Sequence, residues 1–322
     1  MFISLLLLLL GLVILIVGAD SLVRGASSIS KKLGIPPIVI GLTIVAFGTS
    51  APELIINVYS AISGSTDLAL GNIVGSNISN LWLVLGISAI IVDLKVNKHT
   101  TWKEIPFSFL AVLVLFIMTN DIFFDGASDN LINRVEGITL LGFFGIFMFY
   151  TATLLKKKDG VSAEMVPDIK LYHNGIATVM TVVGFFMLFL GGKLLVDNAV
   201  ILARIAGMSE MLIGLTIVAV GTSLPELATS IMAALKKQND IAIGNIIGSN
   251  IFNIFFVLGF TAVVRPIPIT QAANFDIFVC LTATLMLFIA LLMGKKHQLQ
   301  RWQGILMLIA YFTYITYLII RG

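Results

Sequence analysis

Apolar and polar segments alternate regularly along this chain. Ten apolar stretches are separated by short polar connections, and they cover approximately residues 2–24, 36–62, 68–92, 104–120, 132–155, 173–198, 209–234, 241–263, 273–293 and 302–320. A helix needs about 20 apolar residues to cross a bilayer. The pattern therefore predicts an all-α integral membrane protein with ten transmembrane helices.

The composition supports this prediction. Hydrophobic residues make up 58% of the chain and charged residues only 11%, with a net charge of +3. Soluble domains have about 25% charged residues, so an ordinary soluble enzyme, a disordered protein and a nucleic-acid-binding protein with a basic face are excluded. Ten helices would use roughly 200 residues, which leaves no room for a large soluble domain. We expect no cofactor, because the three histidines all lie in polar connections and the single cysteine lies in an apolar stretch.

The distribution of Lys and Arg predicts the orientation of the chain. Fourteen of them lie in the connections after odd-numbered apolar segments, and four lie on the opposite side. Because positive charges accumulate on the cytoplasmic side, we expect a multi-pass cell-membrane protein with both termini extracellular. The lipid bilayer is its expected partner, and nothing in the sequence implies an obligate protein partner. The first segment lacks a basic leader and a cleavage site, so we interpret it as a spanning helix and not a signal peptide.

The two halves of the chain are related by an internal repeat. GLTIVAFGTSAPE begins at Gly41 and GLTIVAVGTSLPE at Gly214, while GNIVGSNISN begins at Gly71 and GNIIGSNIFN at Gly244, so both motifs recur at an offset of 173 residues. Each half contains five predicted helices, and an odd number inverts the second half relative to the first. We therefore predict two inverted five-helix repeats, residues 1–155 and 173–322, joined by a cytoplasmic linker at 156–172.

The first repeated motif places acidic and hydroxyl side chains at a predicted helix break. Pro52 and Pro225 lack an N–H and clash with the carbonyl four residues earlier, so each helix should kink there. Carbonyls freed at membrane depth are tolerated where they line a cavity or contact a ligand. Within about one turn of each break lie a threonine, a serine and a glutamate, namely Thr49, Ser50 and Glu53 in the first half and Thr222, Ser223 and Glu226 in the second.

The two glutamates indicate a cation-binding site. A carboxylate in the bilayer core needs a partner, and neither motif contains Lys or Arg, so a bound cation is the simplest partner. The second motif adds side-chain oxygens at i, i+4 spacing on one helix face, from Ser76, Asn80, Ser249 and Asn253. Oxygen donors with two negative charges suit Ca²⁺ or several Na⁺ ions, and not Zn²⁺ or copper. The alternative is a protonated glutamate pair in a structural hydrogen-bond network.

On these doubled G-T-S-x-P-E and G-N-x-x-G-S-N motifs, the sequence resembles the calcium/cation antiporter superfamily, and within it prokaryotic members of the sodium/calcium exchanger family. The resemblance implies a core of the second, third, seventh and eighth helices that holds one Ca²⁺-preferring site and several Na⁺ sites. It implies that Glu53 and Glu226 are shared ligands and that the first and sixth helices slide across the core. The remaining ligands that it implies are Thr49, Thr222, Ser50, Ser76, Ser223, Ser249 and the carbonyls of Ala46 and Ala219.

Two positions that vary among such relatives are both asparagine here, Asn80 and Asn253. Some relatives, including potassium-dependent ones, have aspartate at one of them. Two central carboxylates match the charge of one Ca²⁺, which argues against a potassium-dependent exchanger.

The sequence thus predicts a secondary antiporter that exchanges Na⁺ for Ca²⁺ by alternating access. A proton-coupled Ca²⁺ antiporter of the same superfamily remains an alternative. A cation channel is less favoured, because channels are commonly built from symmetric oligomers around one pore. An intramembrane enzyme is disfavoured by the lack of a nucleophile–base pair and of a histidine set.

Overall fold

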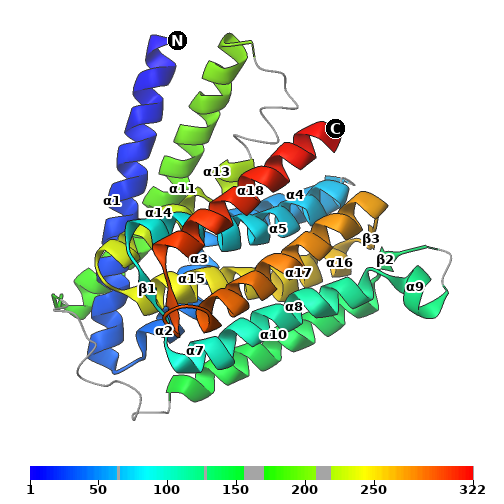
Figure 1. Ribbon diagram of the computed structural model, residues 1–322. Helices are drawn as coiled ribbons and strands as arrows, with labels where there is room; N and C mark the ends of the chain where they lie inside the picture. Colours follow the sequence, from blue (N-terminus) through cyan, green and yellow to red (C-terminus); the bar gives the residue numbers. More distant parts are fainter. Residues whose placement is uncertain (64–65, 127–128, 156–169, 208–218, 322) are drawn as a thin grey trace.

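The computed structural model describes residues 1–63, 66–126, 129–155, 170–207 and 219–321 (Figure 1). Nearly all of them are helical. Within this described part, eight helices are long and apolar enough to cross a membrane, and a bent pair, Pro37–Thr49 with Ala51–Ile62, forms a ninth candidate. The multi-pass helical architecture expected from the sequence is therefore confirmed. The predicted segment 209–234 and the predicted linker 156–172 fall partly outside the described residues.

The first half contains α1 (Phe2–Leu33), α2 (Pro37–Ile40), η1 (Gly41–Val45), α3 (Ala46–Thr49), α4 (Ala51–Ser63), α5 (Thr66–Ile78), η2 (Ser79–Val84), α6 (Leu85–Ile91), β1 (Leu94–Lys95), α7 (Lys98–Trp102), α8 (Glu104–Met118), α9 (Asp121–Asp125), β2 (Leu131–Ile132) and α10 (Arg134–Leu155). The second half contains α11 (Asn174–Ile205), α13 (Ala219–Thr222), α14 (Leu224–Leu235), α15 (Asn239–Ile251), η6 (Phe252–Leu258), α16 (Gly259–Val264), β3 (Ile267–Pro268), α17 (Gln271–Leu292), β4 (Gln298–Leu299) and α18 (Arg301–Arg321).

Helices α1 and α11 are longer than the apolar segments that predicted them. Each has 32 residues, or about 48 Å, against a hydrocarbon core of about 30 Å. Lys31 and Lys32, which were expected in a connection, lie in the last turn of α1 before Gly34 ends the helix with φ of 64°. The helix extends this far because cations are favourable at a helix C-terminus and glycine readily adopts the left-handed cap.

The long helices α1 and α11 lie side by side along one flank of the molecule (Figure 1). Glycines allow their backbones to touch. A Cβ added to Gly18 would lie 2.7 Å from the Cβ of Met187 and 2.9 Å from the backbone nitrogen of Leu188. Similar close contacts occur at Gly11, Gly25, Gly184 and Gly191. Small residues that let backbones approach closely are a main source of helix association in lipid, so this pair forms a tight unit.

Two short β-ribbons depart from the all-α expectation. Strand β1 pairs antiparallel with β4, and β2 pairs antiparallel with β3. Each strand has only two residues and lies in a connection between helices. Extended backbone there leaves N–H and C=O groups free, and pairing satisfies them. Each ribbon joins a connection of the first half to one of the second half.

The two most enclosed spans lie at the centre of the fold. In an 18-residue apolar stretch of each span, 83% of the residues are buried in both Ala69–Ile91 and Asn239–Val264. The corresponding share is 22% in α1 and 28% in α11. Both central spans contain a π-helical segment, η2 and η6, and a third, η1, precedes α3. These wider turns were not predicted, because their i+5 hydrogen bonds leave no signature in hydrophobic spacing. They often occur at functional sites.

Candidate cation-binding site

Both proline-containing motifs interrupt their helices. Ser50 ends α3 with φ and ψ of −86° and 5°, and Ser223 precedes α14 with −86° and 4°. The two residues are 173 positions apart, as the sequence repeat requires. In the first half, the segments on either side of the break are bent by 46°. Pro52 has no N–H for the carbonyl of Gly48, so the predicted break at this motif is confirmed.

The broken helix has a polar inner face and an apolar outer face. Thr49, Ser50 and Glu53 are almost fully buried. Phe47 lies two positions before Thr49 and Ile55 two positions after Glu53, and both are more than half exposed on the protein surface. This periodicity directs the carboxylate and both hydroxyls into the protein and directs the apolar side chains towards lipid.

Glu226 lies at the centre of a cluster drawn from both halves. Its Oε1 accepts hydrogen bonds from the hydroxyls of Ser50 at 3.3 Å and Ser249 at 3.5 Å. The Thr49 hydroxyl lies 3.4 Å from that of Ser249 and donates to the Oδ1 of Asn245 at 3.0 Å. The structure therefore brings together residues of α3, α14 and α15 that are up to 200 positions apart in the sequence.

Glu53 lies close enough to Glu226 for the two carboxylates to interact electrostatically, and Ser76 adjoins it. Both glutamates have only 1% of their surface exposed. Among the ion pairs formed within the described residues, none involves Glu53 or Glu226. If both carboxylates are ionised they repel each other, and a bound cation between them would remove this cost.

Six buried side-chain oxygens of the predicted ligands have no hydrogen-bond partner, among the sixteen such oxygen and nitrogen atoms of the described residues. Buried polar groups are normally paired, so a group of unpaired oxygens indicates a missing ligand. Those from the predicted site are Glu53 Oε2, Glu226 Oε2, Ser76 Oγ, Ser223 Oγ, Asn80 Oδ1 and Asn253 Oδ1. Carboxylate, hydroxyl and amide oxygens are the donors that Ca²⁺ and Na⁺ prefer.

Three further predicted ligands are the carbonyls of Ala46 and Ala219 and the side chain of Thr222. The carbonyl of Ala46 accepts a hydrogen bond from the Ser50 backbone at 2.9 Å, within the helix, and lies 3.3 Å from the Thr49 hydroxyl, which has its shorter contact with Asn245. Thr222 is half-buried, and Ala219 opens α13 directly after residues outside the described part of the chain. These positions are not among the unpaired oxygens above.

Three asparagines that the sequence interpretation left out contribute to this region. Asn245 accepts from Thr49 and donates to the Ser230 hydroxyl at 3.1 Å. Asn77 and Asn250 bond with each other's backbone and with Asn253 and Asn80. The signal was present in the repeated motif, where these asparagines recur at the same offset as the residues that were selected.

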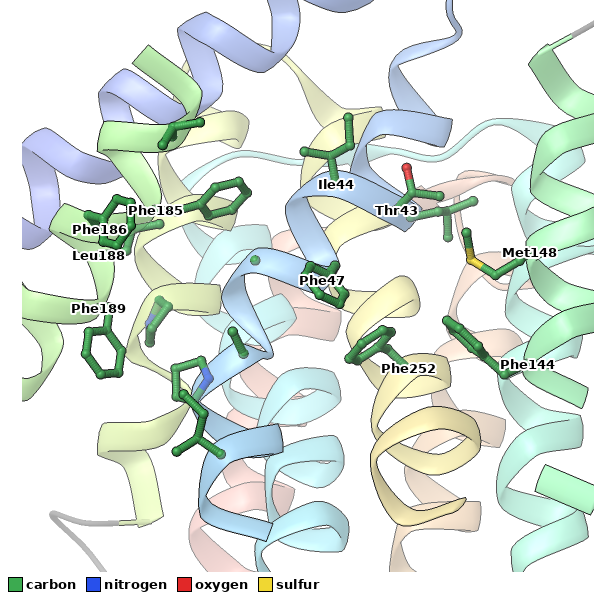
Figure 2. A pocket seen from close by; sticks show the side chains of 17 residues that line it. Thr43, Ile44, Phe47, Phe144, Met148, Phe185, Phe186, Leu188, Phe189 and Phe252 are labelled. Carbon is green, nitrogen blue, oxygen red and sulfur yellow. The ribbon is translucent and has the colours of Figure 1, made fainter. Parts of the chain in front are cut away.

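An apolar pocket of about 680 Å³ lies against the outer face of the break (Figure 2). Phe185, Phe186 and Phe189 of α11 face Phe47 across it, and Phe252 of η6 adds a further ring. Gly48 and Pro52 also line it. Because its lining is almost entirely apolar, this pocket is not the cation site. It leaves space between α11 and the broken helix.

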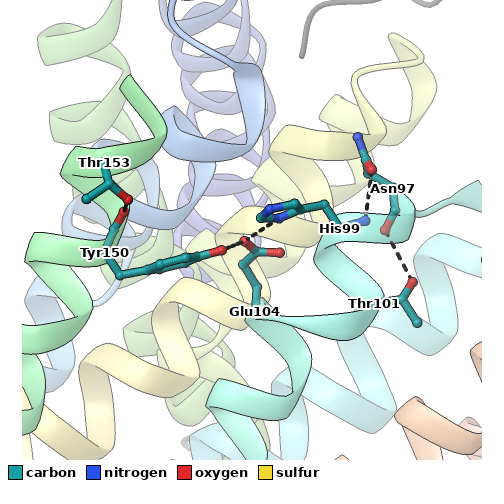
Figure 3. A network of polar contacts seen from close by, with 6 residues as sticks. All are labelled: Asn97, His99, Thr101, Glu104, Tyr150 and Thr153. Carbon is teal, nitrogen blue, oxygen red and sulfur yellow. Dashed lines mark hydrogen bonds and ion pairs between the residues drawn. The ribbon is translucent and has the colours of Figure 1, made fainter. Parts of the chain in front are cut away.

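A third buried carboxylate, Glu104 of α8, has its own partners (Figure 3). Its Oε1 accepts from the hydroxyl of Tyr150 and lies 3.3 Å from the Nδ1 of His99. No sequence motif signals this network, because its members lie in three different elements, α7, α8 and α10. The Oε2 of Glu104 has no partner, as in the two glutamates of the candidate site, but its Oε1 has a phenol and an imidazole beside it where Glu226 has two serine hydroxyls.

The network predicts a stability effect at Tyr150. We expect Tyr150→Phe to lower the stability of the purified protein by about 1–3 kcal/mol, because buried Glu104 loses a donor. Thermal unfolding in detergent measures this loss. Tyr59→Phe is the matched control, since Tyr59 is 71% exposed and should tolerate the change. Equal melting temperatures for the two variants would contradict the prediction.

Comparison with known proteins places this arrangement in a family. The family model described as sodium/calcium exchanger protein matches residues 3–153 and 176–320, nearly the whole chain. The chain belongs to the sodium/calcium exchanger family. It is 41% identical to the protein CaxA of Alkalimonas amylolytica, with 98% of both chains covered, and 29% identical to the sodium/calcium exchanger MaX1 of Methanosarcina acetivorans, again with 98% of both covered.

A solved structure of a family member matches the fold over its full length. The sodium-calcium exchanger NCX_Mj, soaked with zero Na⁺ and Ca²⁺, superimposes with a TM-score of 0.82 at 32% identity, covering 98% of this chain and 99% of that one. The exchanger fold suggested by the repeated motifs is thereby confirmed.

Proposed function

We propose that this protein is a secondary antiporter that exchanges Na⁺ for Ca²⁺ across the cell membrane by alternating access. The observation that carries the proposal is the pair Glu53 and Glu226, which are buried, close enough to interact electrostatically and in no ion pair within the described residues. Family membership supports it, as do the names of MaX1 and NCX_Mj. The cycle needs no cofactor, no chemical catalysis and no protein partner.

The proposed ligands are Glu53, Glu226, Thr49, Thr222, Ser50, Ser223, Ser76, Ser249, Asn80, Asn253 and the carbonyls of Ala46 and Ala219. Two carboxylates neutralise one Ca²⁺ or two of several bound Na⁺ ions. If Ca²⁺ and several Na⁺ ions were bound together, their summed positive charge would exceed the negative charge of the two carboxylates. Na⁺ and Ca²⁺ therefore compete for the shared oxygens. An empty centre with charge −2 is costly to move past the apolar barrier, which couples the two fluxes.

We also propose the inverted-repeat architecture of ten spanning helices, with halves at 1–155 and 173–322 joined by a cytoplasmic linker at 156–172. The matching backbone angles at Ser50 and Ser223 support it. The positions of two strands support it as well, because β1 begins at Leu94 and β3 begins at Ile267, which is the repeat offset of 173 residues later. Both termini lie on the same side of the molecule (Figure 1), and the Lys and Arg distribution favours the extracellular side.

In this proposal the α1–α11 pair moves as a unit against the core. The glycine contacts hold the two helices together, while the apolar pocket separates α11 from part of the broken helix. The contact between them is local, since the Phe185 ring packs against Gly48 and leaves no room for a Cβ there. Apolar contacts can slide without leaving buried polar groups unpaired, which favours movement at this surface.

The ion coupling is tested by ⁴⁵Ca²⁺ uptake into proteoliposomes. We expect uptake driven by an outward Na⁺ gradient and suppressed by Na⁺ in the external solution, because both ions use Glu53 and Glu226. Vesicles with a pH gradient and no Na⁺ are the control. Uptake driven by the pH gradient alone would favour a proton-coupled Ca²⁺ antiporter, whose carboxylates would be protonated in the return step, and would contradict Na⁺ coupling.

A further inference from the structure

We infer that Asn77 and Asn250 are positioning residues that direct the amide oxygens of Asn80 and Asn253 towards the transported cations. The inference rests on the proposed function, because it assigns Asn80 and Asn253 to the cation site. We call the four residues together the asparagine clasp. All four are at most 1% exposed, and they lie where α5–η2 meets α15–η6.

The first arm of the clasp has only one chemically consistent orientation. The backbone carbonyl of Asn250 can only accept, so the atom of Asn77 that lies 3.2 Å from it must be the amide nitrogen. This leaves Oδ1 of Asn77 as the acceptor for its next neighbour, the Nδ2 of Asn253 at 3.1 Å. The oxygen of Asn253 therefore points away from the clasp, and it is buried without a partner.

The second arm repeats this arrangement from the other half of the chain. Asn250 donates from Nδ2 to the backbone carbonyl of Asn77 at 3.4 Å and accepts on Oδ1 from the Nδ2 of Asn80 at 3.0 Å. The oxygen of Asn80 is likewise buried and unpaired. Asn77 and Asn250 are 173 positions apart, as are Asn80 and Asn253, so each arm is the repeat equivalent of the other.

The clasp decides which end of each carboxamide a cation meets. The amide torsion of asparagine has roughly two-fold preferences, so an unrestrained side chain can present either its oxygen or its NH₂ group. An NH₂ group repels a cation, whereas the oxygen binds it. In the clasp, turning Asn253 over would place its oxygen against the Oδ1 of Asn77 and lose a buried hydrogen bond. An ionised aspartate at position 80 or 253 has no N–H to donate, so the clasp favours asparagine there.

A double-mutant cycle separates this positioning role from general stabilisation. The half-saturating Ca²⁺ concentration and maximal rate of ⁴⁵Ca²⁺ uptake are measured for N77A, N253A, N80A and the doubles N77A/N253A and N77A/N80A. We expect N77A to raise half-saturating Ca²⁺ about tenfold with less than a twofold change in maximal rate. Because Asn77 acts through Asn253, N77A should add nothing further to N253A. Combined with N80A, which belongs to the other arm, N77A should still raise the half-saturating Ca²⁺ concentration by its full factor.

A purely structural role would make the two doubles behave alike, and that result would overturn the inference. N120A is the matched control, because Asn120 and Asn274 form a reciprocal amide pair at 2.9 and 3.2 Å outside the site. Its half-saturating Ca²⁺ should be unchanged. If N77A does not fold, the equivalent cycle with N250A, N80A and N253A gives the same test.

The same variants are also titrated with Ca²⁺ by calorimetry in detergent. Absence of Na⁺-driven uptake by the wild type, with the expected binding pattern intact, would reject Na⁺ coupling and leave the clasp supported. Normal wild-type exchange with unchanged Ca²⁺ affinity in N77A would reject the clasp alone.

Discussion

Glu53→Gln and Glu226→Gln are each expected to abolish Na⁺-driven Ca²⁺ uptake in proteoliposomes, a loss of roughly a hundredfold or more. Glutamine keeps the size of the side chain, and at position 226 its oxygen can still accept from Ser50 and Ser249. What it removes is the charge that offsets the dehydration of Ca²⁺ in a buried site. The loss should therefore appear in ion binding and not in the amount of folded protein.

Glu136→Gln is the matched control for these variants. Glu136 lies in the first turn of a spanning helix, α10, and accepts a hydrogen bond from the backbone of Asn133 outside the site. It should transport at the wild-type rate. Near-normal exchange by Glu53→Gln or Glu226→Gln, with equal amounts of protein in the vesicles, would show that the carboxylate pair does not hold the transported ions.

Gly18→Leu is expected to reduce exchange by roughly a hundredfold while Ca²⁺ binding by the purified protein remains within about threefold of the wild type. A Cβ at this position would lie 2.9 Å from the backbone of α11, and backbone cannot move aside as a side-chain end can. Leucine would force α1 and α11 apart and stop them from moving as one unit. Glu53, Glu226 and their hydroxyl neighbours lie on α4, α5, α14 and α15 and at the break between α3 and α4, so the site itself should survive.

The control for this substitution is Gly145→Leu on α10, also within a spanning helix. A Cβ at Gly145 meets nothing within 4 Å of the described structure, and leucine there should be tolerated in lipid. Transport is compared by ⁴⁵Ca²⁺ uptake and binding by calorimetry. Full transport by Gly18→Leu would argue against a rigid α1–α11 pair, and loss of binding together with transport would indicate that the substitution disrupts the core.

The helical membrane architecture could be predicted from the sequence because it depends on local properties. A bilayer requires a long apolar stretch for each span, and the alternation of such stretches is visible without any tertiary contact. The breaks at the two motifs are equally local, since Pro52 and Pro225 remove their own backbone hydrogen bonds. The repeat offset of 173 residues could also be measured directly, and it singled out Glu53 and Glu226 as equivalent positions.

The lengths of α1 and α11 were underestimated for a related reason. Polar residues such as Lys31 and Lys32 marked the end of each apolar stretch, but a helix can continue beyond the membrane wherever its cap and its charges suit its terminus. The β-ribbons were not predicted, because each pairs connections far apart in the sequence, such as Leu94 with Leu299. Neither strand is long enough to show an alternating pattern.

The sequence by itself determined which residue types the two repeated motifs bring to the site: two acids, several hydroxyls and amides, and no Lys or Arg. Only the tertiary structure decided in which direction the oxygen and nitrogen atoms of these side chains point and which partners they meet. The orientation of Asn253 follows from a carbonyl of Asn250 acting through Asn77, and Glu104 gains partners because Tyr150 and His99 reach it from other helices. Hydrophobic spacing records burial along one helix, whereas hydrogen-bond direction depends on atoms supplied by other helices.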